Sequence, residues 1–468
     1  MEKSIVEYFG SRGLNRCGYC KSDNTKANHG MWAHQLTCQD YQDLLNRGWR
    51  RSGKYCYKPT MNKTCCPQYT IRCEVSKVKL SKSQKKVIKR LNTYLITGKK
   101  PAEPVQLENS DIIPDNQSSS SKLGGHSESV ECSQNRITAG GTKSENPVSK
   151  NIQGADPNKP RCRKAKDLRK ERKLSKQLKG KSDGVEANAS TVAKGKNNEK
   201  NIEQLIEDLP SELAHNLEVT LVCCSPISPE FQSVYENECK LFKKYQMNIH
   251  KEAPEDCEEK QFKRFLVDGP LVPVQKGTRE DIPTPGLGAF HQLYHLDGKL
   301  IAVGVLDILP NCVSSKYFFY DPEYSFLSLG TYSALREIYF IRSLQRDCAA
   351  IKYYYMGYYI HSCPKMRYKG RYDPSYLLCP EAYTWQPYPS CVPKLDANKY
   401  SRLEEDESKK PVTIDVNSTL ILHQSQAMPF FIYLSMVKPR DKKEQTKEVT
   451  EYSNLAGITA SSMLLYRS

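Results

Sequence analysis

The sequence predicts an α+β protein in which a small cysteine-rich domain and a larger mixed domain are joined by a disordered linker. Three observations support this prediction. Residues 1–97 are rich in Cys, Tyr and Trp, residues 98–200 contain no aromatic side chain, and from residue 201 apolar residues again alternate or recur at helical spacing. At 468 residues the chain is long enough to bury a core without disulfide bonds.

Charge and hydropathy narrow the class of protein. Lysine and arginine number 70 against 53 acidic residues, and the net charge of +17 favours a polyanionic partner, with nucleic acid first. The longest apolar run, Leu300–Leu306, is too short to span a bilayer, and the first residues lack the apolar core of a signal peptide. We therefore expect no membrane partner, and we expect the 18 cysteines to be thiols or metal ligands.

The cysteine-rich domain is predicted to span residues 1–97 and to end in a helix. Ser81 or Ser83 can serve as its N-cap, and Gly98 is the expected C-terminal stop. The apolar residues that recur on one face of this helix are Val87, Ile88, Leu91, Tyr94 and Leu95.

Residues 98–200 form the predicted linker. Ser, Asn, Lys, Gly and Pro dominate this stretch, so it cannot bury enough apolar surface to offset its chain entropy. Within it, residues 161–181 carry eleven Lys or Arg against two acidic residues. This run is either a solvated basic linker or a segment that contacts phosphate groups or directs nuclear import, and both interpretations stay open.

The larger domain is predicted to span residues 201–438. Strands are expected near residues 217–221, 298–309, 314–320 and 352–360, and helices near residues 231–245 and 329–344. The order strand, strand, glycine-containing loop, helix, strand is typical of α/β and α+β domains. Residues 439–468 form a C-terminal tail, charged and then mildly apolar, which the pattern alone does not place.

The cysteine spacing favours a metal site near the N-terminus. Cys17-Gly-Tyr-Cys20 has the spacing with which two thiolates bind one tetrahedral metal ion, and a second pair of ligands must complete the site. Buried structural thiols are the alternative. The candidates for the second pair are Cys65-Cys66, the set of His29, His34 and Cys38, and finally Cys56 and Cys73.

Several longer segments carry a family resemblance. In the N-terminal part they are Arg16-Cys-Gly-Tyr-Cys20, Gly30-Met-Trp-Ala-His34, Tyr41-Gln-Asp-Leu44, Gly48-Trp-Arg-Arg-Ser-Gly-Lys-Tyr55 and Thr64-Cys-Cys-Pro-Gln-Tyr-Thr-Ile-Arg-Cys73. Further along they are residues 297–310, Tyr320-Asp-Pro322, Leu327-Ser-Leu-Gly330, Ser333-Ala-Leu-Arg-Glu-Ile338, Tyr355-Met-Gly357 and Ile360-His-Ser-Cys-Pro-Lys-Met366. In this order they resemble the eukaryotic arginyl-tRNA–protein transferases.

The resemblance implies a function and its partners. Members of the family transfer arginine from arginyl-tRNA to the α-amine of acceptor proteins with acidic N-termini, Asp or Glu, and oxidised Cys is a further candidate. Ubiquitin ligase machinery then acts on the product, which is degraded through the N-degron pathway. The expected localisation is cytoplasmic, and nuclear as well if residues 161–181 direct import.

The resemblance also implies a cofactor and a fold. Cys17, Cys20, Cys65 and Cys66 match the residues that hold zinc or an iron–sulfur cluster in the family. The larger domain is expected to share the acetyltransferase (GNAT-like) fold, in which backbone N–H groups at a helix start bind acetyl-CoA pyrophosphate. Because Leu327-Ser-Leu-Gly330 is not a glycine-rich phosphate loop, no acetyl-CoA is expected, and we expect this loop to meet the 3′ end of the tRNA.

Aminolysis of an aminoacyl ester needs a proton acceptor and groups that position both substrates. Asp307, near the end of a predicted strand, is the candidate catalytic proton acceptor, and a turn cap before Pro310 is its alternative role. Basic and aromatic residues nearby suit tRNA phosphate, terminal adenine or an acidic acceptor, while core packing and surface ion pairs are the alternatives. The candidate substrate- and tRNA-binding residues are Arg336, Tyr358, His361, Lys365, Arg367, Lys369 and Arg371.

Two other functions fit part of the pattern. A non-catalytic metal-containing protein that binds tRNA or other RNA would explain the charge, the CxxC motif and the tyrosines, but it gives Asp307 no role. An acetyltransferase of the same fold is disfavoured by the missing phosphate loop. Arginine transfer is therefore the function that we predict.

Overall fold

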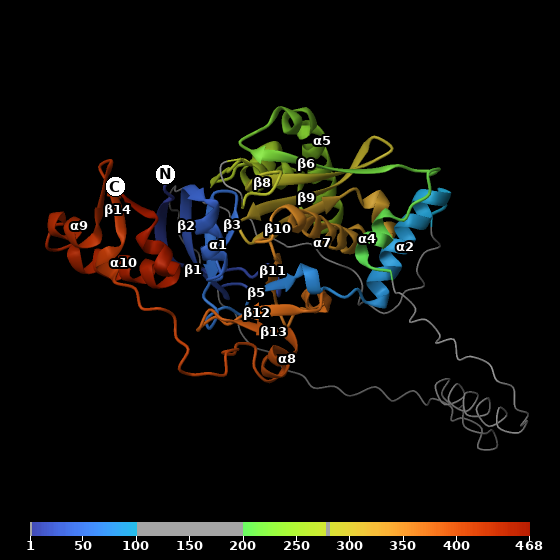
Figure 1. Cartoon of the computed structure of the whole chain (residues 1–468). Coiled ribbons are helices and arrows are strands. Elements are labelled where there is room, and N and C mark those ends of the chain that lie inside the picture. Colours follow the sequence, from blue (N-terminus) through green and yellow to red (C-terminus); the bar gives the residue numbers. More distant parts are fainter. Residues whose placement is uncertain (1, 101–199, 278–280) are drawn as a thin grey trace, which may run out of the picture. The chain divides into compact units, whose positions relative to one another are not determined.

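The computed structural model describes residues 2–100, 200–277 and 281–468. These residues belong to one compact unit, in which helices pack against two eight-stranded sheets (Figure 1). The predicted mixture of strands and helices is confirmed. Most of the predicted linker, residues 101–199, lies outside the described residues, and so does the basic run at 161–181. Of the helices described, none is long and apolar enough to cross a membrane.

The first sheet combines strands from both ends of the chain. Its order is β15-β14-β16-β1-β2-β4-β3, and β7 pairs with β2 beside this path. Strand β16 runs parallel to β1, so the C-terminal residues that the pattern did not place complete a sheet begun at the N-terminus. The strands are β1 (Ile5–Asn15), β2 (Lys26–Thr37), β3 (Arg50–Ser52), β4 (Tyr55–Pro59), β7 (Leu271–Val272), β14 (Leu420–His423), β15 (Gln426–Pro429) and β16 (Leu464–Arg467).

The second sheet carries the candidate site. Its order is β13-β12-β5-β11-β10-β9-β8-β6, and β5 pairs with β11 through Tyr69 opposite Tyr359. Strands from both sides of residue 97 therefore share one sheet, while the division of the chain into domains stays a prediction. The strands are β5 (Tyr69–Glu74), β6 (Leu217–Ser225), β8 (Gly288–Leu296), β9 (Lys299–Leu309), β10 (Cys312–Tyr320), β11 (Tyr353–Tyr359), β12 (Ser375–Leu378) and β13 (Trp385–Pro387).

The helices begin and end largely where local sequence signals place them. The long helix α5 starts with Ser228 as N-cap and Pro229 in its first turn, and α2 ends at Gly98, whose φ of 67° suits glycine. The helices are α1 (Cys38–Leu45), α2 (Lys82–Thr97), α4 (Ile202–Glu207), α5 (Pro229–Tyr245), α6 (Glu259–Phe262), α7 (Leu329–Asp347), α8 (Tyr388–Ala397), α9 (Phe430–Met436) and α10 (Lys442–Ala456).

The predicted order of strands and helices in the larger domain is confirmed by β6, α5, β9, β10, α7 and β11. Strand β8 was not predicted, because His291, Gln292 and His295 interrupt its apolar pattern. The structure buries His291 completely, and its Nδ1 lies 2.6 Å from the Glu238 carboxylate of α5, so a polar pair occupies this part of the core.

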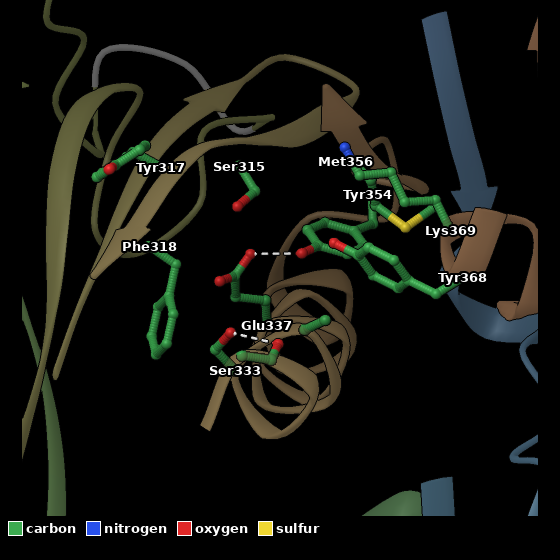
Figure 2. Close-up of a pocket in the computed structure, with 11 residues that line it drawn as sticks. Ser315, Tyr317, Phe318, Ser333, Glu337, Tyr354, Met356, Tyr368 and Lys369 are labelled. Carbon is green, nitrogen blue, oxygen red and sulfur yellow. Dashed lines mark hydrogen bonds between the residues drawn. The ribbon is translucent and has the colours of Figure 1, made fainter. Parts of the chain in front are cut away.

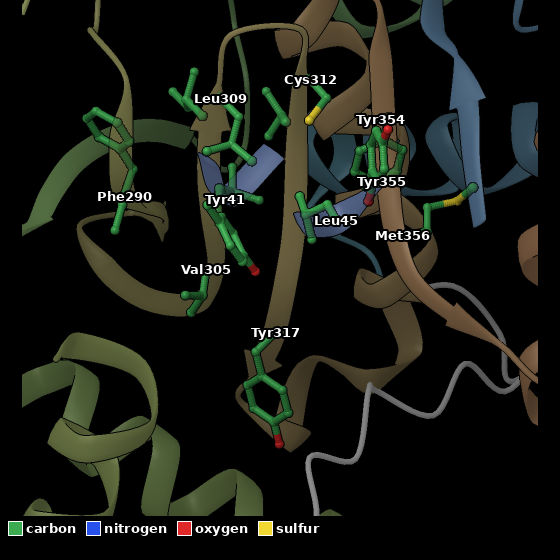
Figure 3. Close-up of a cluster of buried hydrophobic side chains, with 14 of the residues drawn as sticks. Tyr41, Leu45, Phe290, Val305, Leu309, Cys312, Tyr317, Tyr354, Tyr355 and Met356 are labelled. Atoms are coloured by element: carbon green, nitrogen blue, oxygen red, sulfur yellow. The ribbon is translucent and has the colours of Figure 1, made fainter. Parts of the chain in front are cut away.

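The core continues across the predicted boundary at residue 97. Figure 3 shows Tyr41 and Leu45 of α1 beside Leu309 of β9 and Cys312 of β10. All four side chains are at most 1% exposed. Helix α1 therefore packs into the apolar layer of the second sheet, and the N-terminal residues help to hold that sheet in place.

Candidate active site and metal site

A hollow forms where two parallel strands of the second sheet stop pairing. Strands β10 and β11 pair from Cys312 opposite Tyr353 to Ser314 opposite Tyr355, yet β10 continues to Tyr320 and β11 to Tyr359. Helix α7 begins beside this divergence, so the three elements line a small pocket that opens to solvent. Its lining residues are Ser315, Tyr317, Phe318, Gly330, Ser333, Ala334, Glu337, Tyr354, Met356, Tyr368 and Lys369.

A buried carboxyl group lies in this pocket. Glu337 of α7 is 1% exposed and accepts a hydrogen bond of 2.7 Å from the Tyr354 hydroxyl of β11, and Figure 2 shows the two side chains pointing toward each other. Burial raises the pKa of Glu337 to about 7, because desolvation disfavours the charged form more than the hydrogen bonds from Tyr354 and Ser315 favour it. A carboxyl group with this pKa can accept and release a proton near neutral pH.

Tyr354 is suited to donate to that carboxyl group. Burial, followed by the nearby Glu337 carboxylate, raises the pKa of Tyr354 well above its ordinary value, so the phenol keeps its proton at neutral pH. The pair of Glu337 and Tyr354 thus places a proton acceptor and a proton donor at one wall of the pocket.

A buried lysine lies in the pocket lining as well. Lys369 belongs to η6 (Pro364–Arg371), is 1% exposed, and donates a hydrogen bond of 2.8 Å to the backbone carbonyl of Tyr358. Its neighbour Gly370 passes so close to Tyr388 that a Cβ there would lie 2.2 Å from the tyrosine ring. The close packing of η6 against α8 fixes the position of Lys369, a basic side chain in the pocket lining.

Asp307 lies elsewhere, in a buried ion pair. Its carboxylate is 0% exposed and accepts two hydrogen bonds from the Arg51 guanidinium of β3, one of them 3.0 Å long from Nε to Oδ2. Asp307 is not among the residues that line the pocket. Its role as proton acceptor stays a prediction, and the pair with Arg51 gives it a structural role that the sequence did not reveal.

The other predicted substrate-binding residues are not among those that line the pocket. Tyr358 is 4% exposed and donates a hydrogen bond of 2.9 Å to the Gly48 carbonyl, while His361 lies between Tyr359 and Asp396 at 2.7 and 2.8 Å. Arg336 is half-buried and stacks over the Tyr339 ring at 5.0 Å. The exposed members of the set are Lys365, Arg367 and Arg371.

The four predicted cysteine ligands come together. One sulfur atom from each of Cys17, Cys20, Cys65 and Cys66 lies within 4.8 Å of all the others, and the Cys20 and Cys65 sulfur atoms are 3.4 Å apart. The first two cysteines occupy the loop between β1 and β2, and the backbone N–H of Cys65 donates to Thr25 in the same loop at 2.9 Å. The group is able to hold a metal ion, and four sulfur ligands suit zinc or an iron–sulfur cluster.

The pKa values of the four thiols are not uniform. Hydrogen bonds with Ser22 lower the pKa of Cys20 to about 6, which stabilises the thiolate that a metal ion requires, whereas burial raises the pKa of Cys65 and of Cys66. The other candidates lie outside the group. His29 contacts the Tyr8 hydroxyl at 2.9 Å, and the Cys38 thiol donates to the Val272 carbonyl at 3.3 Å.

The metal site and the pocket are joined by one segment of chain. Cys17 and Cys66 pack in a small buried cluster with Ile360 and Met366, which follow β11. The same segment leads directly into Lys369. The η6 side of the pocket is therefore packed, through this segment, against two of the four cysteines.

Sequence reasoning named Glu337 without giving it a role. A signal was present, because Ala334, Glu337 and Ile341 are spaced by three and four residues and so share one helix face. A carboxyl group on the buried face of an amphipathic helix is costly unless it has partners, and here those partners come from β10 and β11.

Comparison with known proteins identifies the family. The family model described as "Arginine-tRNA-protein transferase, N terminus" matches residues 15–86, and its C-terminal counterpart matches residues 237–379. Arginyl-tRNA–protein transferase 1 of Drosophila melanogaster is 39% identical over the full length of both chains. Arginyl-tRNA–protein transferase 2 of Arabidopsis thaliana is 37% identical over 86% of this chain and 78% of its own length.

A bacterial relative matches a shorter region. An aspartate/glutamate leucyltransferase of Campylobacter jejuni is 38% identical over 85 residues, which cover 18% of this chain and 34% of that protein. The full-length relatives are named as transferases, which removes the support for a non-catalytic RNA-binding protein. The resemblance inferred from the sequence is confirmed: the chain belongs to the arginyl-tRNA–protein transferases, aminoacyltransferases that move arginine from tRNA to proteins.

Proposed function

We propose that this enzyme transfers arginine from arginyl-tRNA to the N-terminal α-amine of proteins that begin with Asp or Glu, with oxidised Cys as a further candidate acceptor. The observation that carries the proposal is the pocket carboxyl group of Glu337, whose pKa of about 7 matches the proton transfer that aminolysis requires.

The reaction forms one bond and breaks one. The acceptor α-amine attacks the carbonyl carbon of the ester between arginine and the terminal ribose, an amide bond forms, and the ester C–O bond breaks. An α-amine has a pKa of about 8, so a carboxylate with a pKa near 7 can take up its proton. The Tyr354 hydroxyl, which hydrogen-bonds to Glu337, passes a proton to the departing ribose oxygen and regains one from the protonated carboxyl group.

The preference for an acidic first residue rests on charge in the pocket. Lys369 lines the same pocket as Glu337, and its ammonium group is suited to pair with an Asp or Glu side chain of the acceptor. Arg336 and the basic residues of η6 add positive charge nearby. The name of the Campylobacter relative, which specifies aspartate and glutamate, is consistent with acidic acceptors.

Fold and cofactor complete the proposal. We infer a GNAT-like transferase fold from the divergence of β10 and β11 beside the start of α7, and a cysteine-rich N-terminal module that holds zinc or an iron–sulfur cluster. When bound, that group cross-links two loops and fixes the segment that leads to the pocket. Degradation of the arginylated product by ubiquitin-dependent proteolysis and residence in the cytoplasm and nucleus follow from the sequence resemblance and the 161–181 run, and belong to the proposal.

The test is transfer of labelled arginine from arginyl-tRNA to peptides that differ only in a first residue of Asp, Glu or Ala. We expect transfer to the Asp and Glu peptides alone.

Lys369→Met should lower kcat/KM for the Asp peptide toward the value for the Ala peptide, with little change in the KM for arginyl-tRNA. Equal use of all three peptides by the wild type would reject the acidic preference.

The same assay separates the two candidate proton acceptors. Glu337→Gln should lower kcat by about 100-fold or more, as expected for the loss of a general base. Asp307→Asn should affect stability more than kcat, because its carboxylate lies in an ion pair outside the pocket. A large loss of kcat in folded Asp307→Asn, with activity kept in Glu337→Gln, would restore Asp307 as the proton acceptor.

A further inference from the structure

Helix α2 has an unusually one-sided charge. It carries five basic side chains and no acidic one between Lys82 and Thr97. Three of the lysines, Lys82, Lys86 and Lys89, are exposed and follow one another at intervals of four and three residues. They therefore lie on one face of the helix, along about 10 Å of its length.

These three lysines have no acidic partner within the ranges that the structure describes. Their mutual repulsion at i, i+4 spacing is unfavourable for an isolated helix, so a bound anion would stabilise this face. Helix α4, which carries acidic residues, contacts α2 where Asn92 donates to the Leu205 carbonyl at 2.7 Å. The carboxylates of α4 and its C-cap are already engaged, in the contacts Glu203 with Arg342, Glu207 with Tyr339 and Asp208 with Lys200.

The position of α2 relates this basic face to the pocket. Arg90 donates a hydrogen bond of 3.2 Å to the Ser328 hydroxyl, directly before α7. Two residues later Gly330 lines the pocket. Tyr94 also packs edge-on against Phe326 of η5 (Pro322–Leu327) at 5.3 Å, and Figure 1 shows α2 beside α4 and α7. The lysine face therefore belongs to a helix that contacts the residues directly before α7, and the first turn of α7 lines the pocket.

We propose that Lys82, Lys86 and Lys89 bind the phosphate backbone of the arginyl-tRNA acceptor stem while the aminoacylated 3′ end occupies the pocket. This inference rests on the proposed function. Lysine is a flexible point charge that contacts phosphate without reading base sequence, which suits a duplex stem. A lipid surface suits this helix less well, because Ile88, Leu91 and Leu95 are buried in the core and leave no apolar face to enter a membrane.

The experiment compares three variants of the full-length protein. The first is Lys82→Gln/Lys86→Gln/Lys89→Gln. The second restores charge, as Lys82→Arg/Lys86→Arg/Lys89→Arg. The matched control, Lys442→Gln/Lys443→Gln/Lys447→Gln, removes the same charge from α10, where acidic residues such as Glu444 and Glu448 intervene. Circular dichroism and thermal midpoints establish that all three fold.

Two readouts follow, and the first needs no catalysis. The dissociation constant of unacylated tRNA is measured at several salt concentrations. The slope of its logarithm against the logarithm of salt concentration should decrease in magnitude by about 2 to 3 in the α2 glutamine variant. The slope should stay unchanged in the arginine variant and in the α10 control. In the transfer assay the KM for arginyl-tRNA should rise about tenfold or more, while kcat and the KM for the acceptor peptide stay within about twofold.

Specific results would overturn the proposal. The first is an unchanged salt slope in the α2 glutamine variant. The second is an equal decrease of the slope in the α10 control. The third is an α2 glutamine variant that binds tRNA as the wild type does but no longer binds phosphatidylserine-containing vesicles. If the wild type failed to arginylate acidic peptides but its tRNA binding still depended on the α2 lysines, the acceptor proposal would fail and this surface would stand.

Discussion

Two buried carboxyl groups, Glu337 and Asp307, have opposite surroundings. Glu337 receives hydrogen bonds from neutral hydroxyl groups, so burial dominates and its pKa rises to about 7. Asp307 faces the Arg51 guanidinium, which neutralises its charge with two hydrogen bonds. The first arrangement suits proton transfer, and the second suits structural cross-linking of β9 to β3.

We predict that the pH dependence of kcat follows the protonation of Glu337. Its active form is the carboxylate, so kcat should rise with pH and level off above about 7 in the wild type, while Glu337→Gln should lose this inflection along with most of its rate. The measurement is a kcat–pH profile under saturating arginyl-tRNA and Asp peptide. The same inflection in Glu337→Gln would assign it to another group.

The free energy of unfolding should also depend on pH through Glu337, and it should decrease as pH rises. Because the folded-state pKa of Glu337 is raised above the unfolded value of 4.5, folding favours the protonated form, and that stabilisation is lost as pH rises from about 4.5 to 7. Urea unfolding of the wild type should show this loss, of about 3 kcal/mol at most, and Glu337→Gln should not.

We predict that Asp307→Asn is destabilising. Removing one partner of a buried ion pair leaves the Arg51 charge uncompensated, and such changes cost about 3–5 kcal/mol. The free energy of unfolding in urea measures this. A loss below about 1 kcal/mol would show that the pair is not a structural link.

At the scale of elements, α2 shows how a local signal sets a helix boundary. The sequence left Ser81 and Ser83 as alternative N-caps. The structure selects Ser81, whose hydroxyl accepts from the Gln84 N–H at 3.2 Å while the Gln84 side chain accepts from the Ser81 N–H at 2.8 Å. This reciprocal capping box holds the first turn, next to Lys82 and Lys86.

Ser81→Ala should therefore destabilise the protein by about 1 kcal/mol, because it removes one half of the capping box. Ser83→Ala is the comparison variant, because Ser83 is exposed inside the helix and its hydroxyl contacts the Ser81 hydroxyl at 3.0 Å, so its loss leaves the bond between Ser81 and the Gln84 N–H in place. Thermal unfolding of both variants provides the measurement. Equal midpoints for the two variants would contradict the assignment of the cap.

At the scale of the whole molecule, the two sheets and the metal site depend on contacts between distant parts of the sequence. Strand β5 inserts between β11 and β12, and Cys17 and Cys66 pack against Ile360 and Met366. The cysteine group is thus built from the N-terminal loops and supported by the segment that leads to the pocket.

We predict that removal of the metal loosens that segment. Chelation, or Cys17→Ser/Cys20→Ser, should increase amide hydrogen exchange across residues 360–366 and lower the thermal midpoint, since bound metal links two loops against this cluster. Elemental analysis of the purified protein identifies zinc or iron. Cys223→Ser on β6 is the control, and equal exchange in all samples would show that the site and the segment are independent.

Much of this protein follows from local sequence. Regular spacing of apolar residues indicated α2, α5 and α7. A continuous apolar run indicated β9, and an aromatic-rich stretch that ends before Asp321-Pro322 indicated β10. The CxxC spacing indicated a metal site because two of its ligands lie in one turn, and the fold then brings Cys65 and Cys66 to them.

Other features were decided by tertiary structure alone. Glu337 has a role only because β10 and β11 diverge around it, and Asp307 is held by Arg51, 256 positions away in the sequence. The tail completes a sheet with β1, and β8 is a strand despite its polar residues because Glu238 satisfies His291. Burial and pairing between distant segments create these environments, and no local pattern encodes them.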